Sequence, residues 1–146
     1  MSYRQILLAV DIAAGGDAIG RRAAALAEAF GATVNLLHVV EYVPMDPAGE
    51  ALMPPPVDLE AELVEGARQR LEEFAERVGL ADAPRDVCVG GIKTEIVRAA
   101  TELDADLIVI GRHQHHGLAL FLGTTERSVV NAAPCDVLAV RVEEQE

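Results

Sequence analysis

The sequence has no tryptophan, and its aromatic content is only 3%. It has two cysteines, Cys88 and Cys135, which stand far apart and form no Cys-x-x-Cys pair, so neither a disulfide framework nor a redox motif is indicated. We expect both to be reduced, buried thiols. No apolar run approaches the length of a membrane span, and the longest is interrupted by Gly111. These absences argue against a disulfide-stapled domain and against a transmembrane protein.

Positive charge is also scarce. Twelve Lys and Arg residues face 24 Asp and Glu, a formal net charge of −12, and Lys93 is the only lysine. A field of this sign repels phosphate backbones and anionic lipids, so we expect no nucleic-acid or membrane partner. The N-terminal apolar stretch ends at Asp11 without a small-residue cleavage site, which favours a buried first strand over a signal peptide. We therefore expect a cytoplasmic protein.

What the sequence does contain is a regular alternation of apolar runs and amphipathic segments within 146 residues, the length of one domain. The expected strands are Ile6–Val10, Thr33–Val40, Asp86–Val89, Asp106–Ile110 and Asp136–Val142. The expected helices are Ala18–Phe30, Asp58–Val78, Thr94–Leu103 and Thr124–Ala132, and the proline-rich segment Glu41–Val57 is an expected loop. This order predicts a single α/β domain over residues 1–146, a doubly wound sheet of five mainly parallel strands.

The stretch from Gly111 to Val142 is the most informative for function. The apolar run Leu107–Ile110 is expected to stop at Gly111, and after a loop the segment Gly123-Thr124-Thr125 opens a helix. This arrangement can hold a phosphate, because glycine lets the backbone come close and the free N–H groups at a helix start carry partial positive charge. In doubly wound sheets, ligands bind beyond the carboxyl ends of the strands near the switch in strand order.

Five segments of the chain carry a family signature: ILLAVD, LLHVVE, DADLIVIG, the glycine-bounded loop and APCDVLAVRV. Together they make the chain resemble the universal stress protein family over essentially its whole length. The resemblance implies a five-stranded Rossmann-like fold of the adenine-nucleotide-binding type and a homodimer. It also implies ATP as a ligand, with or without Mg²⁺, because some members bind ATP through a Gly-x-x-Gly-x(8 or 9)-Gly-Ser/Thr loop. Other members have lost that loop and bind no nucleotide.

The chain keeps most of this loop pattern. Gly111 fits the first glycine and Gly123-Thr124 fits the terminal pair at the shorter spacing, whereas Gln114 stands where the second glycine is expected. A glutamine does not take positive φ as cheaply as glycine does. The resemblance implies that Gly111, Gly123, Thr124 and Thr125 hold the phosphates.

Three further residues complete the predicted nucleotide site. By resemblance, Asp11 meets the adenine or ribose and Val40 lies beside the base. Arg112 is a candidate phosphate contact because it is a charge donor in an otherwise acidic protein. The alternative for Asp11 is an ordinary turn-forming or capping aspartate.

The same loop holds His113, His115 and His116. No cysteine or second acidic ligand accompanies them at a usual spacing, so we predict no metal site. The sequence also lacks a Walker loop and a Gly-x-Ser-x-Gly elbow, and Ser128 has no obvious base. We therefore predict no catalytic residues and no enzyme, with weak ATP hydrolysis or autophosphorylation at most.

The last expected strand, Asp136–Val142, is apolar on both alternations apart from Arg141. As a terminal strand it would leave an exposed apolar edge, which pairing with its own copy across a two-fold axis would remove. Cover by the proline-rich loop is the alternative. The leading hypothesis is thus a homodimeric, ATP-binding regulator in the stress response. The alternatives are a dimeric interaction protein without nucleotide and a hydrolase or ligase of the same nucleotide-binding superfamily.

Overall fold

A computed structural model describes residues 2–12, 16–41, 57–113 and 124–142 of the chain. In chain order, the described elements are β1 (Gln5–Ala9), α1 (Gly16–Phe30), β2 (Thr33–Val40), α2 (Val57–Arg77), β3 (Arg85–Val89), α3 (Ile92–Glu102), β4 (Leu107–His113), α5 (Thr124–Ala132) and β5 (Asp136–Val142). The strands form one parallel sheet in the order β3-β2-β1-β4-β5. The predicted doubly wound fold is confirmed.

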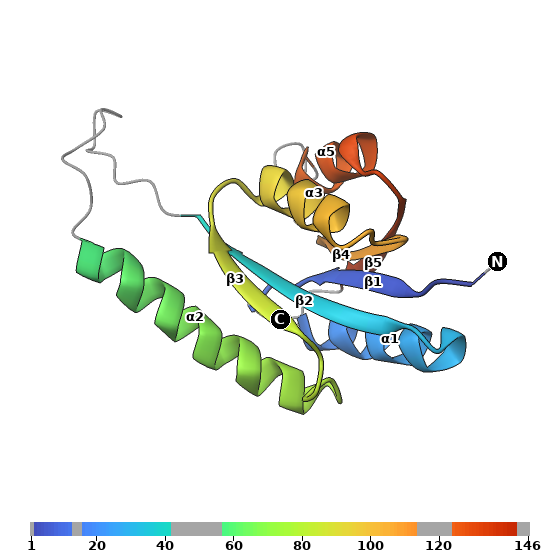
Figure 1. Ribbon diagram of the computed structural model, residues 1–146, viewed down its shortest axis with the longest axis horizontal. Helices are drawn as coiled ribbons and strands as arrows, with labels where there is room; N and C mark the ends of the chain where they lie inside the picture. Colours follow the sequence, from blue (N-terminus) through green and yellow to red (C-terminus); the bar gives the residue numbers. More distant parts are fainter. Residues whose placement is uncertain (1, 13–15, 42–56, 114–123, 143–146) are drawn as a thin grey trace.

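The helices cover the two faces of the sheet. Figure 1 shows α1 and α2 on one face and α3 and α5 on the other. The first two crossovers run outward from β1 to β3, and the chain then returns to the other side of β1 to add β4 and β5. Strand order therefore switches between β1 and β4.

The central strand β1 is apolar without alternation because both of its faces are buried. Ile6 and Leu8 are fully buried in a cluster with Leu71 and Phe74 of α2. Leu7, only 1% exposed, belongs to the second cluster, on the face covered by α3 and α5. A strand covered on both faces requires apolar side chains at every position, because each one leaves water on folding.

Three helices end with a residue in the left-handed conformation. Two of these residues are the predicted caps Gly31 (φ 67°) and Gly79 (φ 80°), while the third is Asp104 (φ 50°). In each case the N–H of the next residue returns to a carbonyl in the last helical turn, at 2.8 to 2.9 Å. This is the Schellman arrangement, in which glycine carries no Cβ penalty and other residues do.

Several predicted boundaries shift by a few residues. β1 begins and ends one residue earlier than expected, β3 begins at Arg85, and α2 begins at Val57, the last residue of the predicted loop. The rest of that loop after Glu41 lies outside the described residues. α1 and α3 each begin two residues early, the latter because Gly91, in an extended conformation, serves as its N-cap.

Both cysteines are free thiols, as expected, but they are half-buried rather than buried. No helix in the described ranges is long and apolar enough to cross a bilayer.

Candidate functional site

The two strands at the switch in strand order part before they end. β1 pairs with β4 only from Ile6↔Leu107 to Leu8↔Val109. β4 continues in register with β5 as far as His113↔Val142. The last four residues of β4 therefore lie beyond its ladder with β1, at the carboxyl edge where doubly wound sheets bind ligands.

Asp11 and Val40 lie at this same edge. The chain leaving β1 follows β2, because the N–H of Val10 donates to the carbonyl of Leu37 at 2.8 Å. Asp11 comes next and is exposed. Val40 ends β2, its half-buried side chain packs on the α1/α2 cluster, and its carbonyl accepts from Gly90 N–H at 3.1 Å. β2 is the neighbour of β1 on the side away from β4, so Val40 is set back from the switch point.

The expectation that the fourth strand stops at Gly111 is wrong. Gly111 lies within β4 and pairs with Val140, and the strand runs on through Arg112 to His113. The extension has a simple cause: all seven residues of β5 pair with β4, and a glycine alone does not end a strand that still has a partner. Gly111 remains half-buried at the carboxyl edge of the sheet.

Helix α5 begins at Thr124, as predicted. Thr124 and Thr125 therefore lie in its first turn, whose backbone N–H groups have no partner within the helix. Gly123 and Gln114 lie outside the described residues. Asp11 thus follows β1 and Gly111 lies in β4, the two strands that separate at this edge. In the chain, α5 is the next described element after β4.

The predicted histidine cluster is only partly described. His113 is the last residue of β4, while His115 and His116 lie outside the described residues. Within the described part of the chain, no three His, Cys, Asp or Glu side chains are placed to hold a metal ion.

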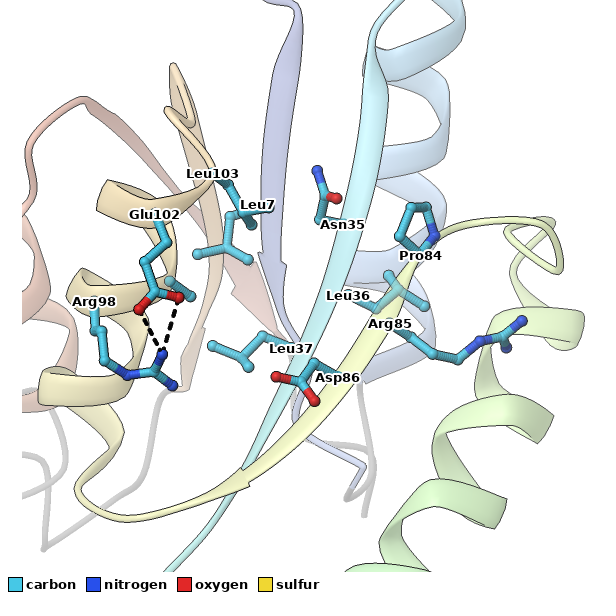
Figure 2. Close-up of a pocket in the computed structure, with 11 residues that line it drawn as sticks. Leu7, Asn35, Leu36, Leu37, Pro84, Arg85, Asp86, Arg98, Glu102 and Leu103 are labelled. Atoms are coloured by element: carbon cyan, nitrogen blue, oxygen red, sulfur yellow. Dashed lines mark hydrogen bonds and ion pairs between the residues drawn. The ribbon is translucent and has the colours of Figure 1, made fainter.

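Two hollows lie away from the strand switch. One, of ≈ 170 Å³, opens between α3 and the strands β2 and β3, with Leu7 and Leu37 in its wall (Figure 2). The other, of ≈ 300 Å³, lies between α2 and β3 and is lined by charged residues such as Arg68 and Arg85. Neither includes a residue predicted to contact nucleotide.

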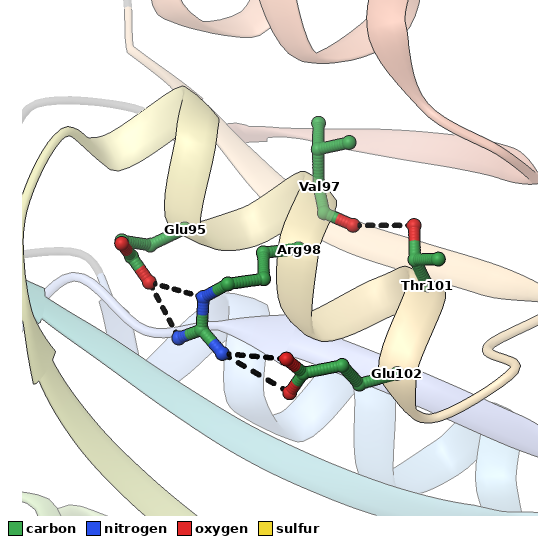
Figure 3. Close-up of polar contacts among 5 residues, drawn as sticks. All are labelled: Glu95, Val97, Arg98, Thr101 and Glu102. Atoms are coloured by element: carbon green, nitrogen blue, oxygen red, sulfur yellow. Dashed lines mark hydrogen bonds and ion pairs between the residues drawn. The ribbon is translucent and has the colours of Figure 1, made fainter.

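Of the two arginines that line the first hollow, one is already paired with two carboxylates. Arg98 donates to Glu95 at 2.7 Å and to both carboxylate oxygens of Glu102 at 3.0 Å (Figure 3). These hydrogen bonds, that of Glu95 foremost, raise the pKa of Arg98. Two carboxylates pair with Arg98, and Asp86 lines the hollow together with the second arginine, Arg85. This groove therefore offers an anion no net positive charge and does not compete with the strand switch as a phosphate site.

Sequence reasoning missed two residues that contact the backbone after β1. The Nδ1 atom of His38 lies 2.9 Å from the carbonyl oxygen of Val10. Gly16 packs against the backbone carbonyl of Asp11. A histidine within an apolar strand was the available signal for the first contact, whereas the second depends on the path of the chain in three dimensions.

The fold and the position of this edge define a Rossmann-like protein of the doubly wound class. The model of the universal stress protein family matches residues 2–141 of the chain. The universal stress protein A homolog 1 of Coxiella burnetii is 35% identical over 144 residues, which cover 99% of this chain and 100% of that protein. The chain belongs to the universal stress protein family.

Solved structures share the fold at lower identity. A universal stress protein in complex with cAMP superposes with a TM-score of 0.70 at 21% identity, covering 96% of this chain and 98% of that one. The universal stress protein from Archaeoglobus fulgidus in complex with dAMP gives a TM-score of 0.63 at 22% identity, covering 98% of this chain and 100% of that one.

Proposed function

We propose that this protein is a cytoplasmic, homodimeric regulator in the stress response that binds ATP at the parting of β1 and β4. The observation that carries the proposal is the early end of the β1–β4 ladder, which places Asp11 and Gly111 on either side of the strand switch. Two proteins of the same fold, held with cAMP and with dAMP, support an adenine nucleotide as the ligand.

We assign the phosphates of the nucleotide to one group of residues. The first turn of α5, with Thr124 and Thr125, supplies backbone N–H groups and the positive end of a helix dipole for the phosphates. Gly111 and Gly123, the glycines that match the family loop pattern, let the backbone approach them. Arg112 adds positive charge that attracts the triphosphate.

We assign the base and the ribose to residues at the ends of β1 and β2. Asp11 follows β1 and is exposed, and a carboxylate at this position can accept from a ribose hydroxyl or an adenine amino group. Val40, at the end of β2, offers apolar contact to the base.

Thermal unfolding with and without Mg-ATP tests the nucleotide site. A ligand that binds only the folded state adds about 2.7 kcal/mol to the free energy of unfolding at a hundred times its Kd. We expect millimolar Mg-ATP to raise the Tm of the wild type and to leave that of Gly123→Val unchanged. An equal rise in both proteins would move the site away from this loop, and no rise in either would contradict nucleotide binding.

We propose that two copies of the chain form the dimer by pairing along β5. This strand is an edge of the sheet, and Ala139 at its middle is exposed. Parallel sheets with an uncovered apolar edge are prone to pair with another chain, and a two-fold axis closes that pairing at two copies. We expect sedimentation to show a dimer for the wild type and monomer for Ala139→Glu, which sets like charges against each other. A dimer that survives Ala139→Glu would contradict the β5 interface.

A second candidate is a dimeric interaction protein of the same fold without nucleotide. Gln114, where the family loop has a glycine, is the observation that favours it. This candidate shares the β5 interface but expects no response to ATP. Neither candidate assigns a catalytic residue to the chain.

A further inference from the structure

The backbone at the end of β1 is held by a side chain of the neighbouring strand. The Nδ1 atom of His38, on β2, lies 2.9 Å from the carbonyl oxygen of Val10. A carbonyl oxygen only accepts, so Nδ1 carries the hydrogen and donates it. This bond adds to the one from Val10 N–H to Leu37 O, so both backbone polar groups of Val10 are tied to β2.

The next carbonyl is in close contact with the chain on its other side. Gly16, the first residue of α1, is buried, and a Cβ added to it would collide with the carbonyl oxygen of Asp11 and lie 3.3 Å from its carbonyl carbon. Only a glycine permits this approach without moving the backbone. Asp11 is thus the residue between two backbone restraints, one from β2 and one from the start of α1.

We propose that His38 is a positioning residue of the nucleotide site, and that it acts by fixing the backbone from which the Asp11 carboxylate projects. The inference rests on the proposed function. A group that recognises a ligand must be held close to its productive geometry, and small displacements reduce binding steeply. Loss of the bond from His38 frees the Val10 carbonyl, and the carboxylate of the following residue moves with that backbone.

A purely structural role is the competing explanation, and the fold provides a matched control for it. Asn35, on the same strand, ties β2 to the opposite end of β1. Its amide nitrogen donates to the Gln5 side chain at 3.0 Å and to the Ile6 carbonyl at 3.4 Å. Loss of either tie loosens the same pair of strands, but of the two only His38 bonds the residue that precedes Asp11.

The test compares Mg-ATP affinity by calorimetry at a temperature where circular dichroism shows every variant folded. His38→Leu removes the donor, and we expect about a three- to tenfold loss of affinity, the worth of one hydrogen bond. His38→Asn keeps a donor at the corresponding position and is expected to bind like the wild type. Asn35→Leu is expected to lower the Tm and to keep wild-type affinity.

A double-mutant cycle shows whether His38 acts through Asp11. In an Asp11→Ala background, we expect His38→Leu to cost no further affinity, because the group that it positions is gone. Should His38→Leu fail to fold, His38→Phe, which keeps a planar ring but has no donor, takes its place under the same expectations.

Two sets of results would overturn the inference. Wild-type affinity in His38→Leu, an additive cycle, or an equal loss in Asn35→Leu would reduce His38 to a structural tie while leaving the nucleotide site in place. A wild type that binds no Mg-ATP would overturn the proposed function and this inference together.

Discussion

Gly20 of α1 and Phe74 of α2 are packed so closely that a Cβ on Gly20 would lie 2.7 Å from the Cζ atom of Phe74. It would also lie 2.9 Å from a methyl carbon of Val78. Phe74 is 1% exposed, so its ring lies within the core and cannot move aside without displacing buried neighbours. The approach of α1 to α2, and with it the start of α1 behind Asp11, depends on the absence of this one side-chain atom.

Gly20→Ala is therefore expected to destabilise the protein by roughly 1–2 kcal/mol, because overpacking outweighs the gain in helix propensity. Gly66→Ala in α2 is the matched control, since its Cβ would meet only the flexible end of Arg70 at 3.4 Å. We expect that variant to gain about 0.5–1 kcal/mol. Urea denaturation measures both, and a stabilised Gly20→Ala would show that the helices do not pack this tightly.

The C-terminus of α3 offers a stabilising substitution. Asp104 has φ 50°, and the N–H of Ala105 donates to the carbonyl of Ala100 at 2.9 Å across it. Asp104→Gly removes the steric penalty of this conformation and should raise the free energy of unfolding by about 0.5–1 kcal/mol. Gly79→Ala, at the equivalent position after α2, should lower it by a similar amount. Changes of the same sign in the two variants would contradict the assignment of the motif.

Alkaline pH tests a contact between the two ends of the described chain. The hydroxyl of Tyr3 donates to Asp136 Oδ2 at 2.8 Å, and this hydrogen bond raises the pKa of Tyr3 above its ordinary value of 10.0. A raised pKa stabilises the fold fully below the unfolded-state pKa, and the stabilisation is lost as pH rises through the folded-state value.

We expect the wild type to be more stable than Tyr3→Phe near pH 8, and the difference to shrink above about pH 10. Phenylalanine keeps the ring that packs edge-on against Phe30, with 5.3 Å between the ring centroids. The variant therefore removes little besides the hydroxyl. Denaturation curves across this range give the difference directly. A difference in the free energy of unfolding that grows at alkaline pH would contradict this contact.

The two thiols should react slowly. Burial is the main cause that raises the pKa of Cys88 and of Cys135, with nearby carboxylates adding to it. A smaller thiolate fraction means slower alkylation, because the thiolate is the nucleophile. We expect iodoacetamide to modify both more slowly in the native protein than in urea, and faster modification of either in the native state would contradict the burial seen here.

The sequence was sufficient to predict the architecture, because each apolar run is the mark of a strand covered on both faces. Gly31 and Gly79 also predicted the ends of their helices. What could not be predicted depends on partners distant in sequence. β4 continues past Gly111 because β5 pairs along its whole length, and Asp104 takes the left-handed conformation that glycine takes after α1 and α2.

The candidate site divides in the same way. Asp11 and Gly111 could be placed at the carboxyl edge from the order of elements alone. His38 and Gly16 could not be assigned a role, because their contacts with Val10 and Asp11 exist only once β1, β2 and α1 are assembled.

Native mass spectrometry of the protein, first as purified and then with Mg-ATP, tests the central claim most directly. The account predicts a dimer that carries adenine nucleotide, and a Gly123→Val dimer that carries none. A bare protein that ignores millimolar Mg-ATP would contradict nucleotide binding and leave the function with the surfaces of the dimer.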